Sequence, residues 1–188
     1  MMRIISGNLK GKKINFIKSS TTRPLRDAVK ENIFNILCHS SKIKVNIENS
    51  NVLDLYSGAG SFGLECISRG AKNVTFIEKD KNAIHKLQVN LRNYLISDKA
   101  QVFCNKIENI VQNRLSKQYN IFFLDPPYSD NMFINNLKLI KLNKIYDKTH
   151  VVILHREKSM KNEDFSNTLN VFEVKNYGRS KIIFGTFI

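Results

Sequence analysis

The sequence predicts an α/β fold with a doubly wound, mostly parallel sheet that ends in an antiparallel hairpin. From residue 51 onward, short apolar runs alternate with longer segments whose apolar residues recur every three or four positions. The fourth run, residues 121–124, is apolar on both faces, as a central parallel strand must be. The last two runs have no helical segment between them, which predicts the hairpin.

Each element follows from its own local pattern. The expected strands are residues 52–56, 74–77, 102–104, 121–124 and 151–154, and the hairpin pairs residues 171–174 with 182–187. The expected helices cover residues 62–69 and 133–142, a segment capped by Asp80 whose apolar face runs from Ile84 to Leu95, and a segment from Ile107 to Leu115. Gly70 is placed to end the first of these helices.

The N-terminal 40 residues precede this alternation. Residues 3–7 and 12–16 predict a short β-hairpin, residues 18–22 a polar loop, and residues 25–38 a helix with Val29 and Ile33 on its apolar face. Residues 40–50 are polar and predict a connection to the sheet.

Composition limits the classes of protein that fit. The chain of 188 residues is 42% hydrophobic, enough for a packed domain, and its net charge of +14 indicates a polyanionic partner. No apolar run has the length of a membrane span and the N-terminus lacks a signal peptide, so we expect a cytoplasmic protein without a membrane partner. Three cysteines without a CxxC pair indicate neither a disulfide framework nor a metal site.

A glycine-rich turn follows the first strand of the sheet. Residues 54–63 place Gly58, Gly60 and Gly63 in a GxGxxG pattern between a strand and a helix. Such a turn holds either a dinucleotide pyrophosphate or the amino-acid part of S-adenosylmethionine. Asp54, just before it, is either a cap at the strand end or the group that holds the cationic amino group of the cofactor.

Further cofactor contacts are expected at the ends of the next strands. Glu78, 24 residues after Asp54, is placed to accept the hydroxyls of a ribose without a 2′-phosphate, although a solvated acid is the alternative. Asn105 is expected to meet the adenine edge and Ile107 to pack on its ring. Tyr56 within the glycine-rich segment completes the expected cofactor-binding set.

Asp125-Pro126-Pro127-Tyr128 is the most informative string in the chain. Two prolines after a buried strand make a rigid corner that presents acceptors, the Asp125 carboxylate and the Pro126 carbonyl. Accepting both hydrogens of an exocyclic amine frees the nitrogen lone pair to attack a methyl group on sulfonium, while Tyr128 stacks on the base. The alternative is a rigid turn with an incidental aspartate.

These motifs together are similar to those of a known family. The Asp-Pro-Pro-Tyr corner, the segment 54–63 and Glu78 resemble class I amino-methyltransferases, which have a Rossmann-like fold. Residues 3–7, Arg23-Pro24 and residues 29–35 narrow the resemblance to the bacterial RsmD family, which methylates N2 of one guanine in 16S ribosomal RNA. The resemblance spans nearly the whole chain. It implies S-adenosylmethionine as cofactor and 16S ribosomal RNA, free or within an assembling 30S particle, as partner.

The chain departs from the usual family pattern at three positions. Leu25 stands where the family usually has threonine, Ala28 where it has a basic residue, and Lys106 where it has a small residue.

We expect two parts along the chain: an RNA-contacting extension, residues 1–40, and a cofactor-binding catalytic domain, residues 41–188.

We expect the basic N-terminal segment to close over an extruded nucleotide and grip phosphates beside the site. The residues expected to contact RNA are Lys10, Lys12, Lys13, Arg23 and Arg26. His85 and His155 lack a nearby nucleophile motif and are interpreted as structural or surface residues.

Three alternatives remain at this stage. The corner also suits methylation of another amine, such as adenine N6 in DNA or RNA or a protein glutamine. A nicotinamide-dependent oxidoreductase would use the glycine-rich turn and would need a further parallel repeat. A non-catalytic RNA-binding assembly factor would use the positive charge alone.

Overall fold

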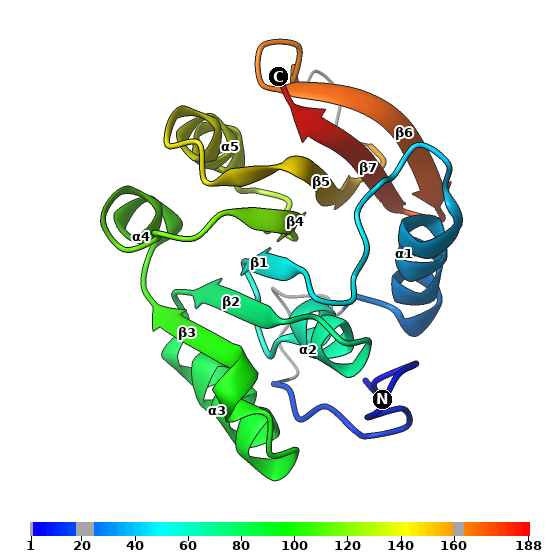
Figure 1. Ribbon diagram of the computed structural model, residues 1–188, viewed down its shortest axis with the longest axis vertical. Coiled ribbons are helices and arrows are strands. Elements are labelled where there is room, and N and C mark those ends of the chain that lie inside the picture. The colour runs from blue at the N-terminus through cyan, green and yellow to red at the C-terminus, as the bar shows by residue number, and fades with distance from the viewer. Residues whose placement is uncertain (1, 18–24, 160–163) are drawn as a thin grey trace.

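The computed structural model describes residues 2–17, 25–159 and 164–188, and these residues form a seven-stranded mixed sheet (Figure 1). The strand order is β3-β2-β1-β4-β5-β7-β6. The parallel strands are β1 (Asn51–Leu55), β2 (Asn73–Glu78), β3 (Ala100–Cys104), β4 (Tyr119–Leu124) and β5 (Tyr146–Glu157). The predicted doubly wound fold is confirmed. No helix within the described ranges is long and apolar enough to cross a membrane.

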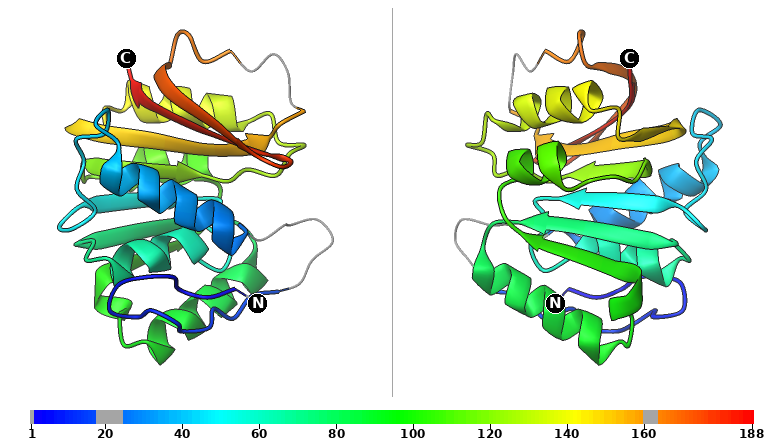
Figure 2. Two further views of the ribbon diagram at one scale, coloured as in Figure 1. Left: turned by 90° about the vertical axis from the view of Figure 1, so that its right-hand side faces the viewer. Right: turned by 60° about the vertical axis from the view of Figure 1, so that its left-hand side comes forward.

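Helices cover both faces of the sheet (Figure 2). One face carries α1 (Asp27–His39), α2 (Ser61–Ser68) and α3 (Lys81–Asn93), and the other carries α4 (Ile107–Asn113) and α5 (Phe133–Leu142). Side chains of a strand alternate between the two faces, so Val52 joins the core under α1–α3 while Leu53 joins the core under α4 and α5. Residues 121–124 are buried throughout, as predicted for a central strand.

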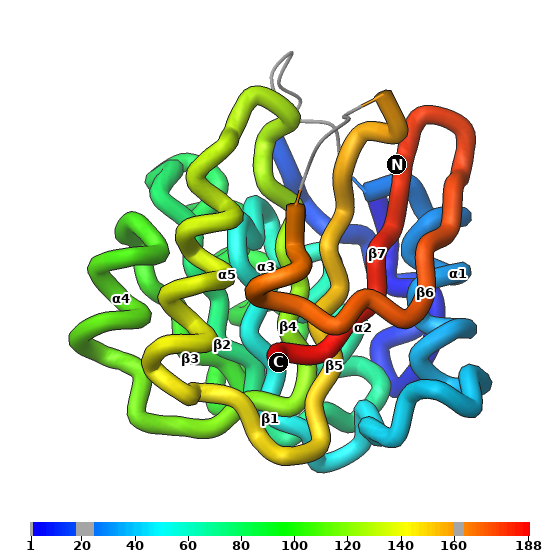
Figure 3. Tube along the Cα trace, turned by 90° about the horizontal axis from the view of Figure 1, so that it is seen from above, coloured from blue at the N-terminus to red at the C-terminus, as the bar shows by residue number. Residues whose placement is uncertain are grey.

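The C-terminal strands β6 (Leu169–Tyr177) and β7 (Ser180–Phe187) form the predicted antiparallel hairpin. Strand β7 also pairs antiparallel with β5, with Glu157 opposite Ser180. The turn of the hairpin therefore lies beside the carboxyl end of β5. Figure 3 shows it at the same end of the molecule as the connection from β4 to α5.

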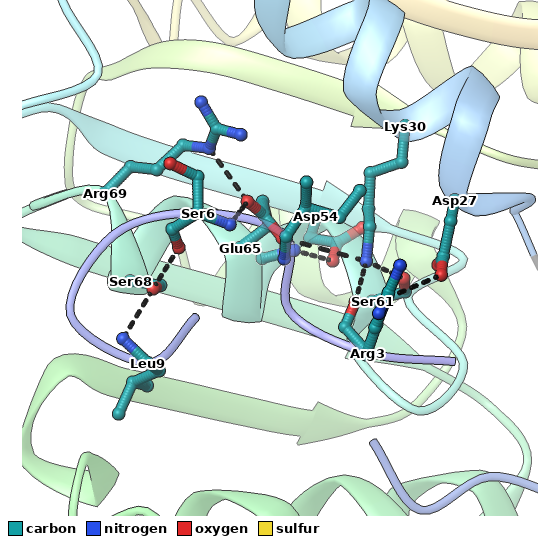
Figure 4. A network of polar contacts seen from close by, with 12 residues as sticks. Arg3, Ser6, Leu9, Asp27, Lys30, Asp54, Ser61, Glu65, Ser68 and Arg69 are labelled. Atoms are coloured by element: carbon teal, nitrogen blue, oxygen red, sulfur yellow. Dashed lines mark hydrogen bonds and ion pairs between the residues drawn. The ribbon is translucent and has the colours of Figure 1, made fainter. Parts of the chain in front are cut away.

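The N-terminal segment lies along α2 as a short hairpin. Its two arms are joined by one bridge, Arg3 with Lys13, and by backbone bonds of Ile4 and Met2 to the opposite arm. The amides of Ile5 and Ser6 turn away from the opposite arm to donate to the two carboxylate oxygens of Glu65, at 2.7 and 2.9 Å (Figure 4). The two arms therefore pair as the predicted hairpin requires, and Glu65 ties the first arm to α2.

A buried ion pair fixes this arrangement. Lys30 of α1 and Glu65 of α2 are both fully enclosed, with 3.8 Å between Nζ and Oε2. The Lys30 ammonium also donates to the Arg3 carbonyl at 2.6 Å and to Ser61 at 3.2 Å. Burial lowers the pKa of Lys30, and the nearby Glu65 carboxylate partly offsets that effect. The ion pair therefore joins the N-terminal segment, α1 and α2 into one unit.

Residues 2–17 and 25–37 contribute to the same core as the sheet. Met2, Ile4, Ile14 and Phe34 belong to one buried cluster with strand residues such as Val52. The predicted boundary at residue 40 therefore does not separate two cores.

Two predicted helix ends were placed too late. Helix α3 ends at Asn93, and Leu95 beyond it is 89% exposed with a φ of 55°. The apolar spacing of Leu91 and Leu95 suggested a longer helix. The chain instead turns away after Tyr94, whose hydroxyl donates to the Lys13 carbonyl. Leu115 likewise lies beyond the end of α4.

Replacing Glu65 by alanine should destabilise the protein by roughly 3–5 kcal/mol, because it leaves a buried ammonium without its carboxylate and two amides without an acceptor. Urea unfolding of the variant measures this. The control is Glu31→Ala on the exposed face of α1, which should change the free energy of unfolding by less than about 0.5 kcal/mol. Equal effects of the two changes would contradict the role given to Glu65.

Candidate active site at the carboxyl ends of β1 and β4

The candidate site lies where the strand order reverses. After β1 the chain adds β2 and β3 on one side of that strand, and it then returns to add β4 on the other side. Ligands of doubly wound sheets bind outside the carboxyl ends of the strands at such a reversal. The Asp125 amide donates to the Leu55 carbonyl at 3.4 Å, so the corner after β4 directly adjoins the glycine-rich turn after β1.

The three glycines of the turn have different surroundings. A Cβ on Gly63 would lie 2.2 Å from the Phe76 ring, and one on Gly60 would lie 2.5 Å from Leu87. These two glycines allow close packing of the helices on the sheet. Gly58 has a φ of 54° and open space where a Cβ would stand, so it alone presents bare backbone to a ligand.

Asp54 is the buried anchor of the turn. Its Oδ2 accepts the Gly63 amide of α2 at 2.9 Å, and the residue is 1% exposed. Burial raises the pKa of Asp54 well above its ordinary range, against the opposing effect of the Gly63 bond, and the charges of Asp125 and Glu78 raise it further. The capping role weighed for Asp54 is therefore present, and its contact with a cofactor stays a prediction.

Glu78 ties the end of β2 to the turn. Its Oε2 accepts the Gly58 amide at 3.0 Å, and its Oε1 accepts the amides of Lys79 and Asp80 at 2.8 and 2.9 Å. These bonds hold the carboxylate at the mouth of the site, half-buried beside the backbone of Gly58. Contact of Glu78 with ribose hydroxyls stays a prediction.

Ser57 provides a polar atom that the sequence did not single out. Its hydroxyl is the one fully enclosed side-chain oxygen or nitrogen without a hydrogen-bond partner among the described residues. An unpaired buried hydroxyl is costly, so the atom is available to a ligand lying on the turn.

The remaining expected cofactor contacts have partners within the protein. The Tyr56 hydroxyl accepts the Asn136 side chain of α5 at 2.8 Å. The Asn105 side chain is exposed and accepts from the Lys106 amide and from Asn109 of α4. Ile107 is nearly enclosed within the core under α4. Contacts of these residues with a cofactor stay predictions.

An arginine that the sequence analysis missed holds the Asp-Pro-Pro-Tyr corner. Arg156 is 1% exposed, donates to the carbonyls of Pro127 and Tyr128 at 3.2 and 3.3 Å, and covers the Phe133 ring. No donor among the described residues reaches the Pro126 carbonyl, which keeps that acceptor available for substrate. The corner is thus fixed by a buried cation as well as by its prolines.

His155, which the sequence left as a structural or surface residue, is buried and lies against the Asp125 corner. Its Nδ1 lies 2.8 Å from Asp125 Oδ1, and its Nε2 lies 2.9 Å from the Ser180 hydroxyl of β7. Burial by itself lowers the pKa of His155, and Arg156 also lowers it, but the charge and hydrogen bond of Asp125 outweigh both, so the pKa is raised. Only the pairing of β4 with β5 reveals this contact, because the two residues stand 30 positions apart.

The basic residues expected to bind RNA lie in different places. The Asn8 amide bonds the Ser68 carbonyl at the C-terminal end of α2, so the turn that carries Lys10 and Lys12 lies there as well. Helix α2 starts at the glycine-rich turn and spans about 12 Å. Lys10 and Lys12 therefore lie at the end of α2 away from the glycine-rich turn, whereas Lys13 stands opposite Arg3, whose carbonyl accepts the Lys30 ammonium that also contacts Ser61. Contact of these lysines with RNA stays a prediction.

Contact of Arg26 with RNA stays a prediction. This residue is exposed at the start of α1, one turn before Lys30, which contacts Ser61 beside the glycine-rich turn. Arg23 lies outside the described residues. Within the described ranges, no cluster of three or more His, Cys, Asp or Glu side chains has the geometry of a metal site.

Comparisons with known proteins agree with this geometry. A family model described as "Conserved hypothetical protein 95" matches residues 2–186. Ribosomal RNA small subunit methyltransferase D of Buchnera aphidicola subsp. Acyrthosiphon pisum is 34% identical over 155 residues, covering 82% of this chain and 78% of that protein. The chain belongs to the RsmD family.

Two other proteins are similar to this chain over a greater length. The putative rRNA methyltransferase YlbH of Bacillus subtilis is 28% identical over 179 residues, which cover 94% of each chain. The solved structure of the putative methylase HI0767 of Haemophilus influenzae is 27% identical and has a TM-score of 0.77, with coverage of 98% of this chain and 97% of that one. The predicted family and fold class are confirmed.

Replacing Asp125 by asparagine should lower the pKa of His155, because it removes the charge and the bond that raise it. Because folding raises the pKa of His155, its pairing with Asp125 also makes the stability of the fold depend on pH. The pair stabilises the fold fully below the ordinary histidine pKa of 6.5, and this contribution is lost as the pH rises through the raised pKa. NMR titration of the histidine rings measures the shift. As a matched control, Asp147→Asn, beside His150 on the same strand, should lower the pKa of His150 and leave that of His155 unchanged.

Proposed function

We propose that this protein transfers a methyl group from S-adenosylmethionine to the exocyclic N2 amine of a guanine in 16S ribosomal RNA. The observation that carries this proposal is the position of Asp125. Its carboxylate lies on a rigid corner directly beside the glycine-rich turn, at the reversal of the strand order. An acceptor for an amine and a site for a nucleoside cofactor therefore share one edge of the sheet. Membership of the RsmD family supports ribosomal RNA as the substrate.

The residues of the turn fit S-adenosylmethionine. Gly58 offers open backbone, Glu78 offers a carboxylate to ribose hydroxyls, and the unpaired Ser57 hydroxyl offers a polar contact. The buried Asp54 carboxyl group, whose Oδ2 already accepts the Gly63 amide, would add a hydrogen-bond acceptor for the amino group of the cofactor. When bound, the cofactor supplies a methyl group activated by its sulfonium.

The corner after β4 prepares the amine for attack. The Asp125 carboxylate and the Pro126 carbonyl accept its two hydrogens, which draws the nitrogen toward a tetrahedral shape. The carboxylate also stabilises the positive charge that develops on the nitrogen as its new bond forms. Tyr128 is placed beside the corner to stack on the base, and Arg156 keeps the corner from moving. Placement in line with the sulfonium provides much of the remaining acceleration.

The fold argues against two of the three alternative functions. An oxidoreductase of the type considered would continue with a parallel repeat, whereas the sheet ends in the antiparallel β6–β7 hairpin. A non-catalytic assembly factor would have no need of the aligned Asp125, His155 and Ser180. Methylation of other amines uses the same corner chemistry, so a substrate assay with 30S particles, naked ribosomal RNA and DNA is required. The proposal is wrong if only DNA or protein accepts the methyl group.

The net charge of +14 supports a ribosomal RNA partner, alone or in an assembling 30S particle. Among the residues expected to contact RNA, Arg26 is exposed at the start of α1, and Lys10 and Lys12 at the C-terminal end of α2 would contact RNA only if it extends along that helix. Removing the whole N-terminal segment would not test this, because Met2, Ile4 and Ile14 are core residues. Charge reversal at single exposed lysines is the suitable approach.

Asp125→Ala should lower kcat by at least about a hundredfold, since one of two acceptors and the nearest negative charge are lost. Affinity for S-adenosylhomocysteine should change little, because the glycine-rich turn remains intact. Methyl incorporation from labelled S-adenosylmethionine into 30S particles measures the first effect and calorimetry the second. Full activity in this variant would rule out the mechanism.

Glu78→Ala should weaken S-adenosylhomocysteine binding roughly tenfold to hundredfold, which corresponds to the loss of hydrogen bonds to a charged group. Calorimetric titration measures the affinity. Glu48→Ala, an exposed acid that precedes β1 at the opposite end of that strand, is the control and should leave the affinity unaltered. An unchanged affinity in the Glu78 variant would remove this residue from the cofactor site.

A further inference from the structure

We propose that His155 and Ser180 are positioning residues for Asp125, which fix one carboxylate oxygen and leave the other to the substrate amine. The inference rests on the proposed function and adds a part of the machinery that the sequence motifs do not contain. It is carried by a continuous chain of contacts across three neighbouring strands, β4, β5 and β7.

The strand register brings the three side chains together. Leu124 pairs with Leu154 in the parallel β4–β5 pair, so the next residues, Asp125 and His155, stand side by side. His155 pairs with Ile182 in the antiparallel β5–β7 pair, which places Ser180 on the same face two residues along. All three residues thus belong to, or directly follow, paired strands, and such elements hold side chains more accurately than loops do.

Burial makes the hydrogen bonds of His155 directional. The residue is 5% exposed, and the Tyr128 ring meets its imidazole edge-on with 6.3 Å between centroids. A buried imidazole needs partners for both ring nitrogens, and Asp125 and Ser180 supply them at 2.8 and 2.9 Å. The ring therefore has one orientation, with Nδ1 directed at Asp125.

The Ser180 hydroxyl suits either charge state of the imidazole. When the imidazole is neutral, Nδ1–H donates to Asp125 and Nε2 accepts from the hydroxyl; when it is protonated, Nε2–H donates to the hydroxyl oxygen. The charged and titratable groups that face His155 among the described residues are Asp125 and Tyr128 from the β4 side and Arg156 from its own strand. In both states the Nδ1–H group of His155 donates its hydrogen bond to Oδ1 of Asp125.

The consequence for the reaction is a fixed carboxylate. No hydrogen bond to Oδ2 of Asp125 occurs among the described residues, so this oxygen remains for an amine hydrogen. A carboxylate held by one oxygen cannot rotate away from the in-line geometry, and misplacement by about 1 Å costs roughly a hundredfold in rate. The arrangement also gives the C-terminal hairpin a role, since its turn delivers Ser180 to the site.

The test compares substitutions of His155 that differ in which ring nitrogen they imitate. His155→Ala should lower kcat for 30S methylation roughly tenfold to hundredfold, while the KM for S-adenosylmethionine and the affinity for S-adenosylhomocysteine stay unchanged. His155→Asn keeps an N–H near the position of Nδ1 and should recover most of the rate. His155→Gln extends its amide toward the position of Nε2 and should recover little.

Two further variants separate positioning from folding. Ser180→Ala should lower kcat a few-fold and shift the pH profile of kcat, because the orientation and titration of His155 change while the strand pairing survives. In the background of Asp125→Ala, adding His155→Ala should cost no further activity, because the imidazole then has no carboxylate to hold. Thermal unfolding of every variant confirms that each is folded.

The outcomes distinguish this inference from the proposed function. Wild-type activity on ribosomal RNA with full kcat in His155→Ala would overturn the inference and leave the proposed function intact. Folded His155→Asn that is as slow as His155→Ala, or additive losses in the double variant, would also overturn it. A wild-type protein inactive on both 30S particles and naked ribosomal RNA would overturn the proposed function and the inference with it.

Discussion

The pairing of β4 with β1 on one side and β5 on the other is the constraint on which the site depends. It places the glycine-rich turn, the Asp125 corner and His155 at adjacent strand ends. Both faces of β4 are packed, so the strand cannot shift its register without moving apolar side chains out of two cores. The site therefore has the rigidity of the sheet core, although its functional groups lie at an edge.

The acidic groups at this edge contrast with the positive net charge of the protein as a whole. The chain carries a net charge of +14, yet three carboxyl groups, those of Asp54, Glu78 and Asp125, gather at this edge; burial, and then the charges of Asp125 and Glu78, raise the pKa of Asp54. Backbone amides bond the first two, and His155 bonds the third. A negative edge suits a sulfonium cofactor and an amine, while the surrounding positive charge suits the phosphates of RNA.

The N-terminal segment shows how a buried polar group adds to a local pattern. The sequence predicted a short hairpin, and its two arms do pair, but Glu65 also takes the amides of Ile5 and Ser6 and balances Lys30. These bonds fix the segment along α2 and direct its lysine-bearing turn away from the mouth of the site. Short-range periodicity does not record such a partner, since Glu65 lies about 60 residues further along the chain.

The sequence by itself determined the layered fold, the glycine-rich turn, the Asp125 corner and the family, because each depends on contiguous residues whose spacing or conformation is diagnostic. Only the tertiary structure decided which side chains meet. Asp125 and His155 become neighbours through strand order, and Arg156 reaches the carbonyls of the corner from the next strand. Contacts of this kind join residues about 30 positions apart, and no local pattern in the chain specifies which strands will be adjacent.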